Sequence, residues 1–229
     1  MASSTYGGWI DLFGWGTSGY NNRHPYMRGF GEEQKEDPLS NDITGTNYDW
    51  GVYNKISNGG DKTNMWRTLT GDEWEYLLRG RIDAEYLFGL ATVNGVYGLI
   101  ILPDNWKTPS DLTFNASITK GLVWEENEEY NYKLYGNPSE NANNYNDNIY
   151  NTAEWTKMES AGAIFLPSGG LWGNDAEKYG YNGRYWSSTF GCIYGDSYGT
   201  SIYICSSGLY PNQAIIAGKC SVRLVNDVK

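Results

Sequence analysis

One stretch decides the fold class to be expected, and it reads WRTLTGDEWEYLLRG from Trp66 to Gly80. Within it, Thr70 offers a hydroxyl and Glu73, three residues later, offers a carboxylate, which is the pattern of a capping box at a helix start. The apolar residues that follow share one helix face: Trp74, Leu77 and Leu78. We therefore expect an amphipathic helix that begins after Thr70 and ends at Gly80, since glycine favours helix ends.

A second helix start lies at Asn151 or Thr152, where Glu154 falls in the first turn. The turns that follow carry the apolar residues Trp155 and Met158. The rest of the chain has no comparable helical pattern. Two helices are therefore expected, and the remaining residues are left to strands and loops.

A turn signal marks the first pair of strands. Asn94-Gly95 lies between the apolar runs 91–93 and 96–102. It predicts a hairpin, because this dipeptide adopts a turn whose twist matches that of paired strands. Further short strands are expected at 163–166, 184–189, 200–205 and 221–225. Strands of this kind with two helices indicate the α+β class, and the length favours a single domain over residues 1–229.

The composition limits the partners of the chain. Its 229 residues include 17 Lys and Arg against 27 Asp and Glu, which gives a formal net charge of −10. Nucleic acids and anionic membranes require a cationic face, so neither is expected as a partner. No apolar run reaches the length of a membrane-spanning helix, and no signal peptide is recognisable after Met1. Residues 127–151 are rich in Asn and Tyr and are expected to form a long solvated insertion.

Residue types that support catalysis or metal binding are scarce. His24 is the only histidine, and it lies in a loop-like Asn-Arg-His-Pro context. The three cysteines, Cys192, Cys205 and Cys220, form no C-x-x-C pair. Residues 144–148 alternate oxygen-bearing side chains but lack the glycine and the distal glutamate of a calcium loop. The sequence therefore predicts no catalytic residue, no metal site and no cofactor.

Several motifs together resemble known proteins. The stretch 66–80, YWSST at 185–189 and GKCSVRLV at 218–225 resemble the signature helix and the closing strands of one group of C-type lectin-like folds. That group is the formylglycine-generating-enzyme branch. Through residues 8–19 and 102–106 the chain is also similar to surface proteins of gut Bacteroidetes and their phages.

The resemblance implies a C-type lectin-like fold, in which two helices flank small, twisted antiparallel sheets with long loops. It also implies that three tryptophans are buried against these sheets: Trp74, Trp155 and Trp186.

The known activities of these folds do not carry over to the chain. Formylglycine-generating enzymes use a pair of cysteines and bound copper, and the cysteines here stand in a different sequence context. Calcium-dependent sugar-binding lectins use a Glu-Pro-Asn or Gln-Pro-Asp loop and a Trp-Asn-Asp strand, and the chain has neither. A binding scaffold remains as the expectation. The alternatives are a surface adhesin or fibre module without a variable site, or an oxidase of the formylglycine-generating kind.

In this branch the C-terminal region is the variable segment of diversity-generating retroelement proteins. There, adenine-directed mutagenesis rewrites asparagine codons of a template. Between Thr189 and Gly218 the chain contains Asn212 as its only asparagine, although asparagine is abundant before this stretch. Replacement of template asparagines would leave such a depletion. The resemblance therefore implies that residues from about 184 to 225 form a variable, ligand-binding segment.

Parts of the variable segment read as loop-like, so its side chains are expected to lie outward and to bind a ligand. The residues in these parts are Ile193, Tyr194, Tyr210, Ile215 and Ile216. Exposed Tyr and Ile on a rigid frame gain affinity by desolvation at a low entropic cost. The candidate binding residues are Phe190, Cys192, Ile193, Tyr194, Asp196, Ser201, Ile202, Ser206, Tyr210, Gln213, Ile215, Ile216 and Lys219. The expected partner is a protein or glycan on a cell surface. The chain itself is expected at a cell surface or on a phage virion, and no oligomeric state is indicated.

Overall fold

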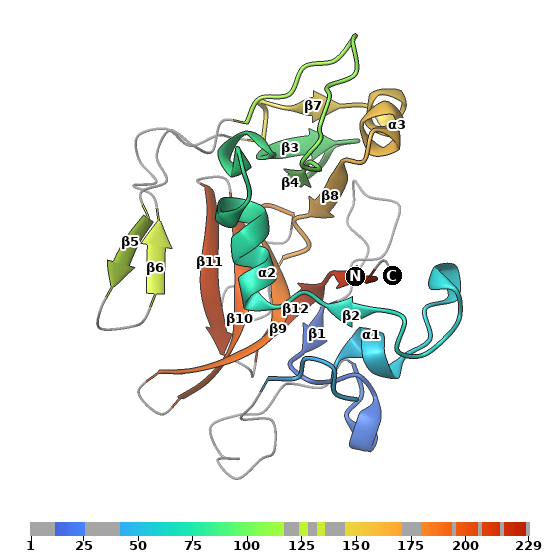
Figure 1. Ribbon diagram of the computed structural model, residues 1–229, viewed down its shortest axis with the longest axis vertical. Helices are drawn as coiled ribbons and strands as arrows, with labels where there is room; N and C mark the ends of the chain where they lie inside the picture. The colour runs from blue at the N-terminus through green and yellow to red at the C-terminus, as the bar shows by residue number, and fades with distance from the viewer. Residues whose placement is uncertain are drawn as a thin grey trace.

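The computed structural model describes residues 12–25, 42–116, 124–127, 132–135, 145–170, 180–193, 196–205, 208–215 and 218–227 (Figure 1). Within these ranges it describes the backbone alone at 58, 124–127, 132–135, 192–193, 196–198, 208 and 210–215.

The described helices are short. They are the 3-10 turns η1 (Tyr20–Asn22), η2 (Ser57–Gly59) and η4 (Ala84–Tyr86), the α-helices α1 (Trp50–Tyr53), α2 (Gly71–Glu75) and α3 (Thr152–Ser160), and the π-helical turn η3 (Tyr76–Gly80), which continues α2.

The described strands form four sheets. The largest has the order β1-β12-β9-β10-β11, from β1 (Phe13–Gly14), β12 (Lys219–Val222), β9 (Gly183–Ile193), β10 (Asp196–Cys205) and β11 (Gly208–Ile215). The second has the order β7-β3-β4-β8, from β7 (Ile149–Tyr150), β3 (Phe88–Val93), β4 (Val96–Ile101) and β8 (Ile164–Pro167). Two strand pairs complete the set: β2 (Arg67–Thr68) with β13 (Leu224–Val225), and β5 (Trp124–Asn127) with β6 (Tyr132–Tyr135).

This mixture of few helices and several small sheets confirms the α+β class. The sheets are not purely antiparallel, however, because β12 runs parallel to β9 and β7 runs parallel to β3. In Figure 1, α2 lies across the long strands β9 and β10, and the contacts between these elements agree with the view. The β5–β6 hairpin contacts the outer strand β11 through β6.

Both predicted helix starts are confirmed. At α2, the Thr70 side chain accepts a hydrogen bond from the backbone N–H of Glu73, and the Glu73 carboxylate accepts one from the backbone of Thr70. At α3, Asn151 and Glu154 form the same reciprocal pair. In each case the cap satisfies backbone donors that the first helical turn leaves without partners.

The predicted hairpin is also confirmed. β3 and β4 pair through a two-residue turn in which Asn94 has φ 50° and Gly95 has φ 77°. Two positive φ values in succession define the turn that fits the twist of paired strands, and Asn and Gly adopt them at low cost.

Buried side chains gather in three groups. The central core joins α2 to both large sheets and consists of Leu69, Trp74, Leu78, Phe88, Leu90, Leu99, Ile101, Tyr145, Leu166, Tyr185, Ile202, Ile204 and Leu209. The tryptophan cluster consists of Trp15, Ile43, Trp50, Trp186 and Cys220. The α3 core lies between α3 and the β3–β4–β8 strands and consists of Leu87, Ala91, Val93, Ile100, Leu102, Tyr150, Met158 and Ala163.

Two of the three tryptophans predicted to be buried are so: Trp74 is 1% exposed and Trp186 is 0% exposed. The prediction is wrong for Trp155, which is only partly buried at the edge of the α3 core. Its ring is tilted against Phe165, with ring centroids 5.7 Å apart. α3 is short, and Met158 takes the fully buried position on its inner face, so Trp155 is left at the rim.

The prediction of a solvated insertion over 127–151 is wrong at its C-terminal end. Tyr145, Asn148 and Tyr150 are buried. The Asn148 side-chain amide donates to the Leu90 carbonyl at 2.9 Å and accepts from the Asn115 backbone N–H at 2.8 Å. These residues are polar in sequence but serve as hydrogen-bonding partners for the edge of the β3–β4 sheet. Residues 128–131 and 136–144 lie outside the described residues.

The prediction that the stretches between the strands expected at 184–189, 200–205 and 221–225 are loop-like is wrong as well. β9 continues to Ile193, β10 begins at Asp196, and β11 is a full strand from Gly208 to Ile215. Glycine and serine made this region read as turns. In the sheet, the backbone of each strand is satisfied by its neighbours, which depends little on side-chain identity.

Replacement of Trp186 by Ala should destabilise the fold by about 3–5 kcal/mol, the range for buried aromatic-to-alanine changes. The side chain is fully buried, and its loss also removes a hydrogen bond from the indole N–H to the Phe13 carbonyl. The measurement is the free energy of unfolding from urea denaturation. Tyr86→Ala is the control, since Tyr86 is 60% exposed and its loss should cost about 0.5 kcal/mol or less. Equal effects of the two substitutions would contradict this account of the core.

Candidate ligand-binding face

The candidate binding residues fall largely in the three strands β9, β10 and β11. The register pairs Ile193 with Asp196 and Cys192 with Ser197 between β9 and β10. It pairs Thr200 with Gln213 and Tyr203 with Tyr210 between β10 and β11. Candidates that are far apart in sequence therefore lie on neighbouring strands of one antiparallel unit.

Two of the candidates cannot contact a ligand, and their prediction as binding residues is wrong. Ser201 is 2% exposed and lies opposite Trp186, and Ile202 is 3% exposed and lies opposite Tyr185. Ile202 belongs to the central core. Both residues are buried because core residues cover both faces of β10 at this point.

The remaining candidates are placed to different extents. Phe190 is half-buried and packs against the tryptophan cluster, and Lys219 is half-buried in β12 opposite Gly14. The backbone of Cys192, Ile193, Asp196, Tyr210, Gln213 and Ile215 lies in the strands. Tyr194, Ser206 and Ile216 lie outside the described residues.

Trp186 anchors β9 to the N-terminal part of the chain. Its ring meets Trp15 edge-to-face, with centroids 5.3 Å apart and planes at 72°. Its indole N–H donates to the Phe13 carbonyl at 2.8 Å. On the next strand, Gly199 leaves room for both rings, because a Cβ there would lie 2.4 Å from Trp15 and 2.8 Å from Trp186. Tight packing of this kind fixes β9 and β10 relative to β1.

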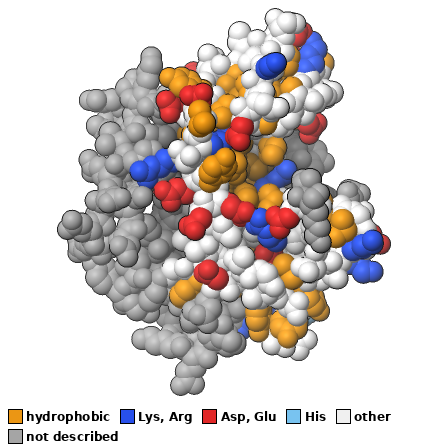
Figure 2. All heavy atoms as spheres, in the orientation of Figure 1, with side chains coloured by type: hydrophobic (Ala, Val, Ile, Leu, Met, Phe, Trp, Pro, Cys, Tyr) orange, Lys and Arg blue, Asp and Glu red, His pale blue; other side chains and the backbone are white. Residues whose placement is uncertain are grey.

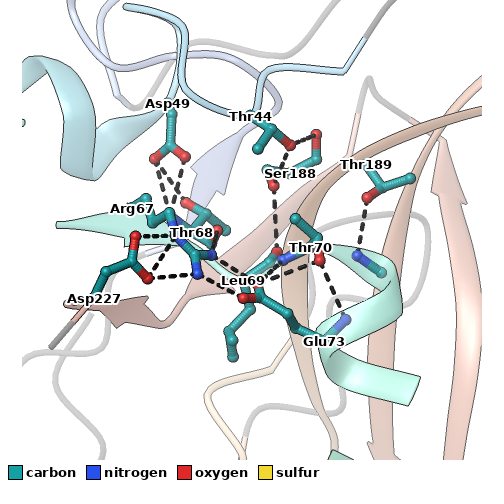
Figure 3. A network of polar contacts seen from close by, with 11 residues as sticks. Thr44, Asp49, Arg67, Thr68, Leu69, Thr70, Glu73, Ser188, Thr189 and Asp227 are labelled. Carbon is teal, nitrogen blue, oxygen red and sulfur yellow. Dashed lines mark hydrogen bonds and ion pairs between the residues drawn. The ribbon is translucent and has the colours of Figure 1, made fainter. Parts of the chain in front are cut away.

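A polar network holds the same strands from the other side (Figure 3). The Ser188 backbone N–H donates to the Leu69 carbonyl at 2.8 Å, and its carbonyl accepts from the Ile43 N–H at 3.0 Å. The hydroxyls of Thr44 and Ser188 lie 2.7 Å apart. β9 is thus tied by its backbone to the segment before α2 and to the segment after residue 42.

The start of α2 contacts β9 and β10 directly. The Gly71 backbone N–H donates to the Thr189 hydroxyl at 2.9 Å, as Figure 3 shows. The Thr200 hydroxyl donates to the Thr189 carbonyl at 3.0 Å and also bonds the Ser187 hydroxyl. These hydroxyls are hydrogen-bonding partners for backbone N–H and C=O groups between α2 and the sheet. In the sequence, Ser187 and Thr189 are recognisable only as part of the YWSST motif.

Charged groups stabilise the segment beside the start of α2. Arg67 donates to Glu73 at 2.7 Å and 2.5 Å and to Asp227 at 2.7 Å. The guanidinium lowers the pKa of both carboxyls, and hydrogen bonding to it is the largest cause in each. Beside it, the carboxylate of Asp49 accepts from the backbone N–H groups of Gly51 and Thr68 at 3.0 Å. Burial raises the pKa of Asp49, against the effect of these hydrogen bonds.

Burial restricts thiol chemistry at the cysteines whose side chains are described. Both Cys205 and Cys220 are buried, and Cys220 is a free thiol. Burial raises the pKa of the Cys220 thiol to about 12, so the thiolate that thiol chemistry requires is suppressed at neutral pH. Among the residues whose placement is described, no group of three or more His, Cys, Asp and Glu side chains could hold a metal ion. In the same part of the chain no helix has the length and apolar character needed to cross a membrane.

Comparison with known proteins gives no relative. No protein-family model, no curated protein and no solved structure matches the chain.

The Arg67 ion pairs predict a pH dependence of stability. Glu73 has a lowered pKa in the folded state, so its contribution is present above the unfolded value near 4.5 and is lost as the pH falls through the folded value. Asp227 acts in the same direction. Between about pH 5 and pH 3, the free energy of unfolding should therefore fall more steeply in the wild type than in Arg67→Gln.

The measurement is urea denaturation at a series of pH values. Arg79→Gln is the matched control, because Arg79 holds an exposed carboxylate, that of Glu75, at 3.3 Å. Asp49 titrates with the opposite sign, since its pKa is raised. Arg67 lowers this pKa, so its removal should raise the pKa of Asp49 further and flatten the Arg67→Gln profile in the same direction. Parallel pH profiles for wild type and Arg67→Gln would refute the assignment.

Proposed function

We propose that the chain is a ligand-binding protein that displays a diversified C-terminal face on a rigid C-type lectin-like scaffold. The ligand is a protein or glycan on a cell surface, and the chain acts at a cell surface or on a phage virion. The α+β architecture with capped α2 and α3 supports the scaffold, since the resemblance implies two helices beside small sheets.

One observation carries the proposal: the β9–β10 ladder continues past Ser188 and Gly199, the last buried residues that the structure describes at this end of the sheet. On β9, residues 189–191 are half-buried, and the strand backbone continues to Ile193. On β10 the described buried residues begin at Gly199, whereas the strand begins at Asp196. Most of the candidate residues that the structure describes lie in these extensions or in β11.

A strand extension suits a variable surface. Its backbone pairs with neighbouring strands through N–H and C=O groups that every residue but proline carries. Side chains along it can therefore change without loss of the ladder, provided the anchored part is kept. Here the anchored part contains Trp186, Ser201 and Ile202, and the asparagine-depleted stretch from Thr189 to Gly218 covers the extensions.

A binding role fits the cysteines better than an oxidase role. A thiol oxidase needs a reactive thiolate, and the thiol of Cys220 is buried with a raised pKa. Cys205 is buried as well. We therefore propose that the chain is not an enzyme.

The decisive test of diversification is the sequence of sibling genes. Substitutions should concentrate in adenine-containing codons between Phe190 and Lys219, and a template repeat of this segment should lie beside a reverse-transcriptase gene. The β3–β4 hairpin of the same gene, Phe88–Ile101, is the internal control and should stay nearly invariant. Substitutions spread evenly over both segments would refute diversification and leave an adhesin or fibre module.

A second prediction separates binding residues from framework residues. The double variant Tyr194→Ala, Ile216→Ala should keep its melting temperature and lose binding, because these side chains are proposed to contact the ligand. Binding is measured on whichever arrayed glycan or surface protein the wild type captures. Ile202→Ala is the control and should cost about 2–5 kcal/mol, since Ile202 is a core residue. A fall of many degrees in the double variant would place Tyr194 and Ile216 in the core.

A further inference from the structure

Three tyrosine rings meet where η1 lies beside α1 (Figure 1). The Tyr20 ring lies edge-to-face against Tyr48, with centroids 5.1 Å apart, and against Tyr53, with centroids 5.6 Å apart. Tyr53 is 39% exposed, and Tyr20 and Tyr48 are half-buried. The rings come from η1, from the segment before α1 and from the last residue of α1. We call these three residues the tyrosine patch.

η1 is fixed by hydrogen bonds to the segments on either side of α1. The buried Ser18 hydroxyl donates to the Asn47 carbonyl at 2.6 Å, and the Asn54 side-chain amide donates to the Ser18 carbonyl at 2.8 Å. Within the turn, the Gly19 backbone N–H donates to the Arg23 carbonyl at 2.7 Å. The rings are therefore held in place by the protein itself, so a ligand that packs against them has little more of the protein to order.

Asparagines accompany the tyrosine patch. Each of its tyrosines has an asparagine next to it in the sequence, and these are Asn21, Asn47 and Asn54. The Asn21 side-chain amide donates to the Tyr48 hydroxyl at 3.1 Å. Asn22 and Asn47 are exposed, and within the described part of the chain no hydrogen bond engages their side chains. Neutral amides, which both donate and accept hydrogen bonds, thus lie close to the rings along the chain.

The charges of the chain favour a neutral ligand for the tyrosine patch. The chain carries a net charge of −10, so anions are repelled at long range. The carboxylate of Asp49, which follows Tyr48, is buried and accepts from the backbone N–H groups of Gly51 and Thr68. It is therefore engaged inside the fold and does not attract a cation to the rings.

A sugar ring with equatorial hydroxyls matches these groups. Its axial C–H groups make each face of the pyranose apolar, whereas its hydroxyls lie around the edge. The C–H face packs against an aromatic ring, and amides bind the hydroxyls as donors and as acceptors. A peptide fits less well, because peptides commonly bind along a strand edge. The described residues that carry the three rings lie in turns and one short helix.

We propose that the tyrosine patch binds neutral pyranose units of a glycan. Tyr53, the most exposed of the three rings, packs against the C–H face, and Asn21, Asn22 and Asn47 bind the hydroxyls. In Figure 1 the patch lies beside α1, whereas the extensions of β9 and β10 run to the opposite side of the view. The site goes beyond the proposed function, because none of its residues is a candidate diversified position. All variants of the diversified face would share it.

The test is saturation-transfer difference NMR of the full chain. Methyl β-cellobioside is the probe, because every substituent on its rings is equatorial, and sorbitol is the control, because it carries hydroxyls without a ring. Magnetisation should pass from the protein to the axial protons of the cellobioside and not to sorbitol. Tyr53→Ala should weaken cellobioside binding by about tenfold. Tyr53→Phe keeps the aromatic face and should keep most of the affinity.

Tyr86→Ala is the matched control for the loss of an exposed tyrosine and should leave cellobioside binding unchanged. The double variant Tyr194→Ala, Ile216→Ala should retain it as well, so the patch and the variable face are tested separately. The melting temperature of each variant checks that it is folded. A folded wild type that transfers no magnetisation to the cellobioside, or a Tyr53→Ala variant that binds it fully, would overturn the site. Loss of binding in the double variant alone would assign the sugar to the variable face and overturn it too.

Discussion

The contact between Trp186 and Trp15 is the constraint on which the rest of the structure depends. It joins the middle of β9 to the segment next to β1 through an edge-to-face contact, and the hydrogen bond to Phe13 fixes the orientation of the Trp186 indole. Gly199 admits both rings. β9 lies at the centre of the five-stranded sheet, so a fixed β9 fixes the neighbours on each side, β12 and β10. The backbone of the proposed binding surface continues from this point. Its position therefore depends on this contact and not on the candidate side chains.

The polar network around Leu69 and Ser188 makes the same frame rigid from the opposite side. Hydrogen bonds from Ser188 to Leu69 and from Gly71 to Thr189 hold α2 against β9, and the Arg67 ion pairs join the helix cap to Asp227. Figure 2 shows acidic and basic side chains close together on this side of the molecule. Apolar packing and charged groups therefore support one strand from two directions.

The sequence predicted those parts of the structure that local chemistry determines. The capping boxes at Thr70 and Asn151 and the Asn94-Gly95 turn each depend on residues within one helical turn or one hairpin. What it missed depends on partners far along the chain. β11 was not expected because its pairing comes from β10 and not from its own glycine-containing sequence. The burial of Ser201 and Ile202 is set by the layers above and below β10, and the burial of Asn148 by a carbonyl at Leu90. The alternation of apolar and polar residues along a strand does not reveal such partners.

The parallel pairing of β12 with β9, together with the pairing of Phe13 with Cys220, has a consequence for biosynthesis. β1 leaves the ribosome long before β12, its partner in the sheet. Until β12 emerges, a nascent chain has β9 with one open edge and β1 without a partner. Completion of the central sheet therefore waits for the synthesis of β12, and the growing polypeptide has to be kept from pairing with other chains through these edges in the meantime.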